Sequence, residues 1–200
     1  KNLDKAIFHI NRLNPKFIVV CGDFVNAMPD NTSVYDEQLK DFKTTMKLLN
    51  PNIPLVCVCG NHDIGNRPTK KNIQKYNSNI GKDYFSFWVS GVRFLCINSQ
   101  LYYNYGKRFK KGSIFSYKDH LDNEDNKPVD WNLVKKHEDW LNLELRKPVR
   151  TIVFSHIPPF FYNLYEKDSY SNIPRSIRFS LLNRLIDGGC CSLFCGHLHR

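Results

Sequence analysis

Four short apolar, β-rich runs in this chain each end in polar residues of the kind that bind metals. The runs are residues 17–21, 54–59, 151–155 and 191–195, and each is followed by Asp, Asn or His. Runs of this length and composition are typical of buried strands. In open α/β sheets the functional crevice lies at the carboxyl ends of the strands. The pattern therefore predicts a sheet that carries a polar site on one rim.

The segments between these runs predict helices and one hairpin. Helical periodicity or capping residues mark residues 1–14, 33–49, 70–79, 130–147 and 176–187, with Ser33 and Asp130 as the expected N-caps. Two further strands, 84–89 and 92–97, flank a Ser-Gly turn and predict a β-hairpin, with burial on both faces of the second strand. This order predicts a layered α/β fold in which helices flank mixed β-sheets, truncated at both ends.

The chain is long enough for one domain with its own core. It has 200 residues, of which 42% are hydrophobic and 14% aromatic, as expected for a folded globular protein. We expect a single, partial domain over residues 1–200, since the chain starts at Lys1 without a methionine. Residues 101–130 lack clear periodicity and are predicted to be an irregular insertion.

The cysteines and the hydropathy indicate a cytoplasmic protein. There are seven cysteines, an odd number, and most lie inside apolar strand-like runs. Buried free thiols are favoured over a disulfide framework, which indicates a reducing compartment. No apolar stretch approaches the roughly 20 residues that a membrane helix needs, so no membrane association is expected.

The formal net charge is +10, which is compatible with phosphorylated substrates, nucleic acids or anionic membranes. The basic residues are scattered, apart from a cluster at 107–111 between two glycines. A solvated loop is favoured there over a surface that steers substrate. Because no aromatic and basic platform or recognition helix is evident, nucleic acid is an unlikely partner.

The polar blocks hold the residue types of a transition-metal site. Asp23, Asn61, His156, His197 and His199 all follow strand-like runs. Carboxylate, amide and imidazole ligands together favour Mn, Fe or Zn over Ca. Two such ions about 3.5–4 Å apart hold a bridging hydroxide and clamp phosphoryl oxygens. In an extended chain His197 and His199 would point to the same side.

Each block has an ordinary structural explanation when it is taken alone. A Gly-Asp pair after a strand usually closes a turn, and a lone histidine before two prolines is as often a packed loop residue. The occurrence of all four blocks in this order makes that explanation improbable. His9, His120 and His137 lie in helical or polar surroundings and are predicted to be surface residues.

These blocks resemble the signature of the calcineurin-like metallophosphoesterase superfamily. That signature runs Asp-x-His, Gly-Asp, Gly-Asn-His-Asp/Glu, a lone His and then Gly-His-x-His. All but the first are present in order, at 22–23, 60–63, 156 and 196–199, so the resemblance covers nearly the whole chain. It implies the layered α/β fold of that family and two bound divalent metal ions.

The resemblance also implies roles for the residues that match the signature. Asp23 would bridge both metals, Asn61, His156 and His197 would complete the second metal, and His199 would serve the first. His62 would be the catalytic histidine, paired with Asp63. The implied reaction is direct attack of a metal-bridging hydroxide on a phosphoric monoester, most simply one carried by Ser or Thr of a phosphoprotein.

Two features depart from the family pattern. The Asp-x-His strand is absent from residues 1–200, and its place would lie just before the first helix. Family members that act on phosphoproteins continue Gly-Asp with an arginine that grips phosphate, whereas residues 24–28 contain none. Asn26 and Arg200 are the alternatives for that role.

Three other functions remain open from the sequence. A phosphodiesterase or a nuclease of the same superfamily is compatible with the basic charge. A scaffold that keeps the fold without the chemistry is the third, and the retention of His62 argues against it.

Overall fold

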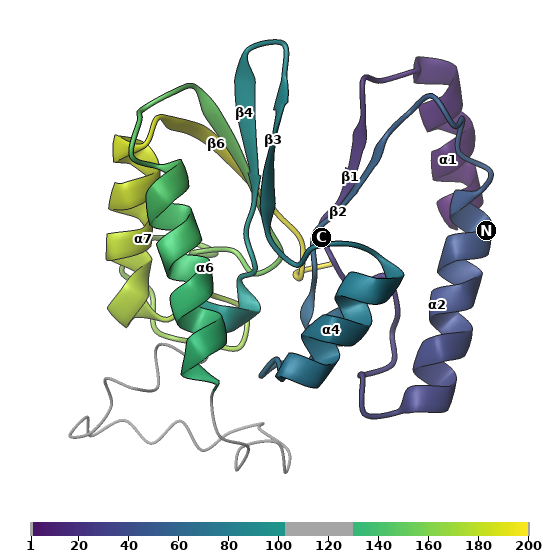
Figure 1. Ribbon diagram of the computed structural model, residues 1–200, viewed down its shortest axis with the longest axis horizontal. Helices are drawn as coiled ribbons and strands as arrows, with labels where there is room; N and C mark the ends of the chain where they lie inside the picture. The colour runs from purple at the N-terminus through teal and green to yellow at the C-terminus, as the bar shows by residue number, and fades with distance from the viewer. Residues whose placement is uncertain (1, 103–129, 200) are drawn as a thin grey trace.

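The computed structural model describes residues 2–102 and 130–199, and Figure 1 shows its layers. The predicted insertion at 101–130 and the basic cluster at 107–111 therefore lie almost wholly outside the described residues. In the described part the helices are α1 (Asn2–Leu13), α2 (Thr32–Met46), α3 (Asn61–Ile64), α4 (Lys70–Asn79), α6 (Trp131–Glu144) and α7 (Arg175–Asp187). The strands are β1 (Ile18–Val20), β2 (Leu55–Cys57), β3 (Phe85–Val89), β4 (Val92–Cys96), β5 (Thr151–Ser155) and β6 (Cys190–Cys195).

The strands form two sheets. Strands β1 and β2 pair in parallel, with Val19 opposite Val56. The second sheet has the order β3-β4-β5-β6, in which β3 and β4 are antiparallel and the other pairs are parallel. The mixed α/β architecture predicted from the sequence is confirmed.

Apolar side chains hold four layers together. Between the sheets, residues such as Val56 pack against Phe94 and Phe154. Helices α1 and α2 cover the outer face of the small sheet through Ile7 and Met46, and α6 and α7 cover the large sheet. Burial of these faces supplies the main stabilisation, at about 25 cal/mol for each Å² of apolar surface.

The predicted hairpin is present at β3 and β4. Its two turn residues, Ser90 and Gly91, have φ values of 51° and 79°, as a type I′ turn requires. Residues Phe94, Leu95 and Cys96 of β4 are buried, which confirms the expected burial of this strand on both faces. Arg93 is also buried there, where it donates to the Gly188 carbonyl and the Thr151 hydroxyl.

The structure corrects two helix predictions. Helix α2 begins one residue before Ser33, and its N-cap is Asn31, whose carbonyl accepts the Tyr35 N–H. The four-residue helix α3 was not expected, because the glycine and polar residues at 60–63 read as a loop. Asp130 is the N-cap of α6 as predicted, and its side chain accepts the Asn132 N–H.

The prediction that His137 lies on the surface is wrong. It is fully buried, not on the surface. The reason is helical spacing: Val134, His137 and Leu141 share the buried face of α6. His9 is exposed, as predicted, and His120 lies outside the described residues. Among the described residues, no helix is both long and apolar enough to cross a membrane.

Candidate metal centre

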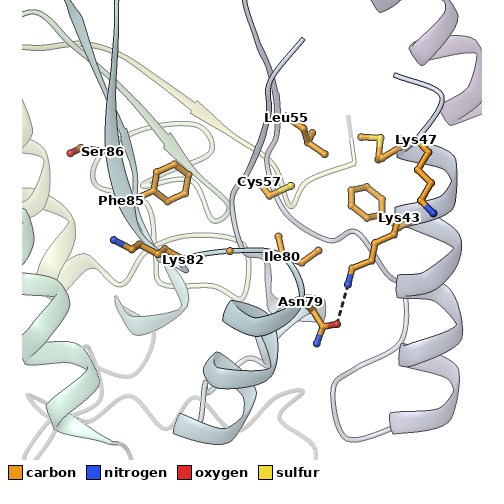
Figure 2. Close-up of a pocket in the computed structure, with 12 residues that line it drawn as sticks. Lys43, Lys47, Leu55, Cys57, Asn79, Ile80, Lys82, Phe85 and Ser86 are labelled. Carbon is orange, nitrogen blue, oxygen red and sulfur yellow. Dashed lines mark hydrogen bonds between the residues drawn. The ribbon is translucent and has the colours of Figure 1, made fainter. Parts of the chain in front are cut away.

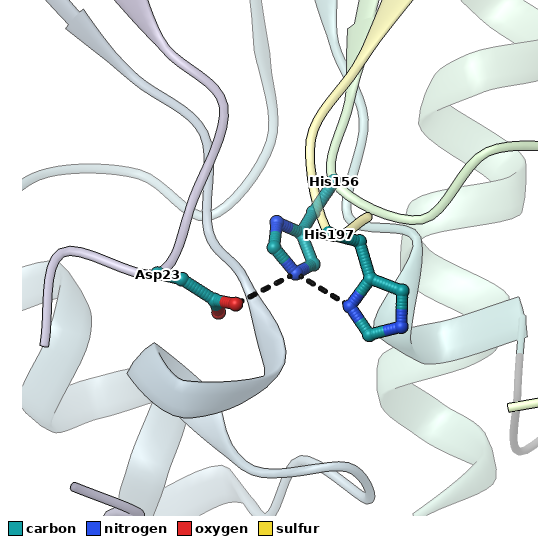
Figure 3. Close-up of side chains that lie close together, drawn as sticks. All are labelled: Asp23, His156 and His197. Atoms are coloured by element: carbon teal, nitrogen blue, oxygen red, sulfur yellow. Dashed lines mark hydrogen bonds and ion pairs between the residues drawn. The ribbon is translucent and has the colours of Figure 1, made fainter. Parts of the chain in front are cut away.

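Four of the predicted ligands meet where their strands end. Asp23 follows β1, Asn61 follows β2, His156 follows β5 and His197 follows β6. Two of these strands belong to each sheet, so the cluster lies at the carboxyl ends of both. Figure 3 shows the Asp23 carboxylate and the His197 ring on either side of the His156 ring. The polar site that the sequence predicted at one rim of the sheet is therefore present.

One nitrogen lies at the centre of this cluster. The His156 Nε2 atom is 3.2 Å from Asp23 Oδ2, 3.1 Å from Asn61 Oδ1 and 3.1 Å from His197 Nδ1. The ligand atoms of Asp23, His156 and His197 all lie within 4.8 Å of one another. His156 and Asn61 are buried, whereas Asp23 and His197 are partly exposed, so the cluster opens toward solvent.

Backbone carbonyls fix the protonation of both imidazoles. His156 Nδ1 lies 2.7 Å from the Cys21 carbonyl, and His197 Nε2 lies 3.3 Å from the Tyr170 carbonyl. A carbonyl only accepts, so each of these nitrogens carries the hydrogen. In the neutral imidazole, the other nitrogen of each ring then presents a lone pair to the cluster. Second contacts of this kind orient metal-binding histidines in proteins.

A tyrosine fixes the Asn61 amide in the same way. The Asn61 Nδ2 group donates to the Tyr170 hydroxyl at 2.7 Å, so Oδ1 faces His156. With both imidazoles neutral, the cluster consists of four lone-pair atoms, from Asp23, Asn61, His156 and His197. Such a set is mutually repulsive unless a cation, or a proton on His156 Nε2, lies among them. The donor set therefore fits a transition-metal ion.

The backbone at the cluster is strained. Asp23, His197 and His199 have φ values of 57°, 72° and 51°, in the left-handed region that non-glycine residues seldom adopt. Such conformations cost about 1–3 kcal/mol each and collect at functional sites. A Cβ added at Gly60 would lie 2.3 Å from Asp23 Oδ1, so only glycine permits this approach of the two loops.

These φ values correct the expected geometry of the last motif. His197 and His199 are not in an extended chain, because the Leu198 N–H donates to the Gly196 carbonyl in a tight turn. His199 is exposed, and the three-residue cluster around His156 does not include it within the described residues. Its role as a ligand of the first metal stays a prediction.

Asp63 binds the loop backbone and does not touch the His62 ring. Its carboxylate accepts the N–H groups of Gly60, Asp23 and Phe24 at 2.7, 2.8 and 2.9 Å. Burial raises the pKa of this carboxyl to about 7, although the Gly60 N–H bond opposes that rise. The three donors favour the ionised form, and they tie the Asp23 loop to the start of α3.

The His62 ring has a different partner from the one expected. Its Nδ1 atom lies 2.6 Å from the Asn26 carbonyl, which replaces the predicted pairing with Asp63. The His62 N–H also donates to Asp23 Oδ1 at 3.1 Å. The ring is partly exposed beside the cluster, with Nε2 left for other contacts. Asn26 thus contacts the site through its carbonyl, and Arg200 lies outside the described residues.

Electrostatics keep the ligands in metal-binding form at neutral pH. Burial and the neighbouring His156 lower the pKa of His197 to about 4, so this imidazole is neutral. Burial alone would raise the pKa of Asp23, but the His156 hydrogen bond and charge and the His62 N–H lower it overall. A neutral imidazole and an ionised carboxylate are the forms that bind metals.

Sequence reasoning missed the residues that support these ligands. Tyr170 was visible only as one aromatic residue in a loop rich in them, and nothing in the sequence tied it to Asn61. The Cys21 and Asn26 carbonyls are backbone groups without any side-chain signal. Such contacts depend on loop conformation, and that conformation is set by the three-dimensional fold.

The fold and the site define a layered α/β protein with a candidate metal centre at the rim of its sheets. Comparison with known proteins identifies the family to which this fold and site belong. The family model described as calcineurin-like phosphoesterase matches residues 1–200. This chain therefore belongs to the calcineurin-like phosphoesterase family.

Relatives and a solved structure agree with this assignment. The chain is 38% identical over 203 residues to serine/threonine-protein phosphatase CPPED1 of Danio rerio, and 38% identical over 205 residues to that of Homo sapiens. Both alignments cover 98% of this chain and 58% of the relative, so the chain spans little more than half of their length. A crystal structure of a dimetal phosphatase from Danio rerio shares the fold, with a TM-score of 0.57 and 15% identity over 98% of this chain and 71% of that one.

Proposed function

We propose that the full-length protein is a metal-dependent phosphoric monoester hydrolase that acts on phosphoserine or phosphothreonine in proteins. The convergence of three acceptor atoms, from Asp23, Asn61 and His197, on His156 Nε2 is the observation that carries this proposal. The names of the curated relatives support the substrate class. When bound, divalent cations polarise phosphoryl oxygens and lower the pKa of water.

The chain's own residues would divide the remaining work. Asp23, Asn61, His156 and His197 would hold one ion, and Asp23 and His199 would contribute to a second. Mn, Fe and Zn all suit this set of donors. Tyr170 and the Cys21 carbonyl would keep the ligands oriented before any ion binds, so little reorganisation is needed.

His62 is the proposed proton donor. Its Nδ1–H is held by the Asn26 carbonyl, so the ring is fixed and Nε2 is the atom that faces substrate. In the imidazolium form this nitrogen would donate its proton to the oxygen of the leaving serine or threonine. General acid catalysis of this type contributes about 10²–10⁴ in rate. Asp63 would act at a distance, as a positioning residue, by fixing the loop that carries Asp23.

A cytoplasmic location is part of the proposal. All seven cysteines lie within the described residues and are free. Burial raises the pKa of Cys57 and Cys195 to about 12, so these thiols stay protonated and inert at neutral pH. Protonated, unpaired thiols in this number fit a reducing compartment.

The test is turnover by the full-length protein with Mn²⁺. A phosphoserine peptide, a small phosphomonoester and a bis-ester are compared, with Asp23→Asn as the control that keeps the side-chain size. We expect hydrolysis of the two monoesters and its loss in the variant. Preferred cleavage of the bis-ester would instead identify a phosphodiesterase. Absence of turnover above the Asp23→Asn background on every substrate would indicate a scaffold.

A further inference from the structure

A groove of about 620 Å³ lies at the edge of the sandwich, and none of its lining residues belongs to the metal centre. Helix α2, strand β2, the segment after α4 and strand β3 form its walls (Figure 2). Its apolar lining comes from Phe42, Met46, Leu55, Ile80 and Phe85. This volume is within the range of specific ligand sites, about 300–1,000 Å³.

One wall of the groove is an open sheet edge. Strand β2 pairs only with β1, and β3 is likewise the last strand of its sheet. The Pro54 carbonyl and the Val58 N–H bond to β1, so the alternate residues, Leu55 and Cys57, direct their backbone groups away from it. The Cys57 carbonyl accepts the Tyr76 hydroxyl at 3.4 Å. Among residues 2–102 and 130–199, no partner bonds the N–H groups of Leu55 and Cys57.

Positive charge flanks the groove on two sides. Lys43 and Lys47 project from α2, and Lys82 lies on the side of β3 (Figure 2). Lys47 and Lys82 are exposed, and Lys43 donates to the Asn79 side chain at 3.0 Å. Among the described residues that line the groove, none is acidic. The surface is therefore complementary to a ligand that is extended, apolar on one side and negatively charged.

The groove is also connected to the metal centre. Cys57, in its wall, lies four residues before Asn61, a span of at most about 13–14 Å in an extended chain. A strand laid along β2 would therefore reach the neighbourhood of the site while remaining outside it.

We propose that this groove docks an extended, acidic segment of a phosphoprotein substrate, which adds as a strand to the open edge of β2. The inference rests on the proposed phosphatase function and specifies its substrates. Backbone hydrogen bonds from the N–H groups of Leu55 and Cys57 give affinity in this mode of recognition, and side-chain pockets give specificity. The lysines select acidic sequences and speed association.

The test uses the full-length protein and three substrates. Two phosphoserine peptides carry either an alternating Glu-Val tail or the same tail with Gln in place of Glu, and the third substrate is a small phosphomonoester. The triple variant Lys43→Glu, Lys47→Glu, Lys82→Glu is compared with a matched triple, Lys5→Glu, Lys136→Glu, Lys147→Glu, on exposed sites elsewhere. We expect the groove variant to raise KM for the acidic peptide about tenfold, from loss of three surface charge contacts. Its kcat and its turnover of the small ester stay unchanged.

A second version of the acidic peptide tests the strand pairing without altering the protein. Methylation of its alternate backbone nitrogens removes the hydrogen bonds and keeps the charge, so KM should rise for the wild type also. The docking proposal would be overturned if the peptides with Glu and Gln tails had equal KM values, or if the matched triple variant raised KM as much as the groove variant. The same results would be seen if another part of the chain covered the groove. Failure of the proposed function is distinct, because the small ester would then not be turned over either.

Discussion

Two buried histidines of this protein have different hydrogen-bonding surroundings. His156 and His137 are exposed by only 1% and 0% of their surface, and both lie among polar groups. The His137 Nε2 atom accepts the Asn98 N–H at 3.3 Å, and Tyr84, Tyr102 and Trp140 surround the ring. His156 Nε2 instead faces three further acceptors, from Asp23, Asn61 and His197.

The difference teaches how to separate a structural histidine from a metal ligand. Burial does not discriminate, since both side chains are inaccessible. The discriminating observation is the partner of Nε2: at His137 this nitrogen accepts the Asn98 N–H, whereas at His156 it faces three groups that are themselves acceptors. The Nε2 atom of His137 is satisfied without a metal, whereas a cation would satisfy the groups around His156.

The largest expected effect is loss of turnover on replacement of His156. In the full-length protein, His156→Gln should lower kcat/KM with Mn²⁺ by about a thousandfold or more, or about 4 kcal/mol of transition-state stabilisation. Stability in the presence of a chelator should change far less than turnover, because His156 would contribute a ligand bond only when a metal is bound. Steady-state kinetics and urea unfolding measure the two quantities. Turnover by His156→Gln at the wild-type rate would show that His156 is not needed for catalysis.

Replacement of His137 should have the reverse pattern. His137→Phe keeps the ring volume but leaves the Asn98 N–H without its buried acceptor, which costs about 1–3 kcal/mol. His137→Ala adds a cavity and should cost about 2–5 kcal/mol. Urea unfolding measures both losses. Turnover per folded molecule should equal that of the wild type, and a variant that is stable but inactive would contradict the structural role.

Tyr170 tests whether the orientation of the lone pairs matters. Tyr170→Phe removes the hydroxyl that fixes the Asn61 amide but keeps the carbonyl that holds His197. We expect Mn²⁺ affinity to fall about 10–100-fold, as for other outer contacts of metal ligands. Calorimetric titration with Mn²⁺ measures it. Tyr165→Phe, on the same loop and 66% exposed, is the matched control and should bind as the wild type does.

The smallest effect concerns acid stability near His137. Glu138 pairs with Arg184 at 2.8 Å, and His137 Nδ1 lies 3.8 Å from its other oxygen. Burial alone would raise the pKa of Glu138, but His137 and Arg184 together lower it to about 2. Because the pKa of Glu138 is lower in the folded state than in the unfolded state, its ionised carboxylate stabilises the fold. This contribution is fully present above the unfolded pKa of 4.5 and is lost as the pH falls toward 2.

At pH 4 this linkage should already cost about 1 kcal/mol relative to pH 6 or above. Urea unfolding of the wild type and of Glu138→Gln at pH 4 and pH 6 isolates the contribution. The wild type should lose about 1 kcal/mol more than the variant between these two pH values. Equal losses would show that the carboxylate is not stabilised by its partners.

The sequence predicted the layers, and the strand ends that carry the candidate ligands, for a physical reason. Alternation and apolar runs report burial directly, so the strands, the hairpin and α4 are found close to their predicted bounds. The Gly-Asp and Gly-Asn-His-Asp blocks indicate that two loop backbones lie close together. At Gly60 they do, since a Cβ there would lie 2.3 Å from Asp23 Oδ1. His137 was missed because its polarity was weighed above its spacing from Val134 and Leu141. The tight turn at His197 could not be predicted, because positive φ in a non-glycine residue has no signal in composition.

The most direct test of the account is the metal content of the full-length protein after equilibration with Mn²⁺ and gel filtration. We expect wild type and His137→Phe to retain the same number of ions per chain, and His156→Gln to retain at least one fewer. Wild-type metal content in His156→Gln would contradict the central claim that the four strand ends form a metal centre around His156.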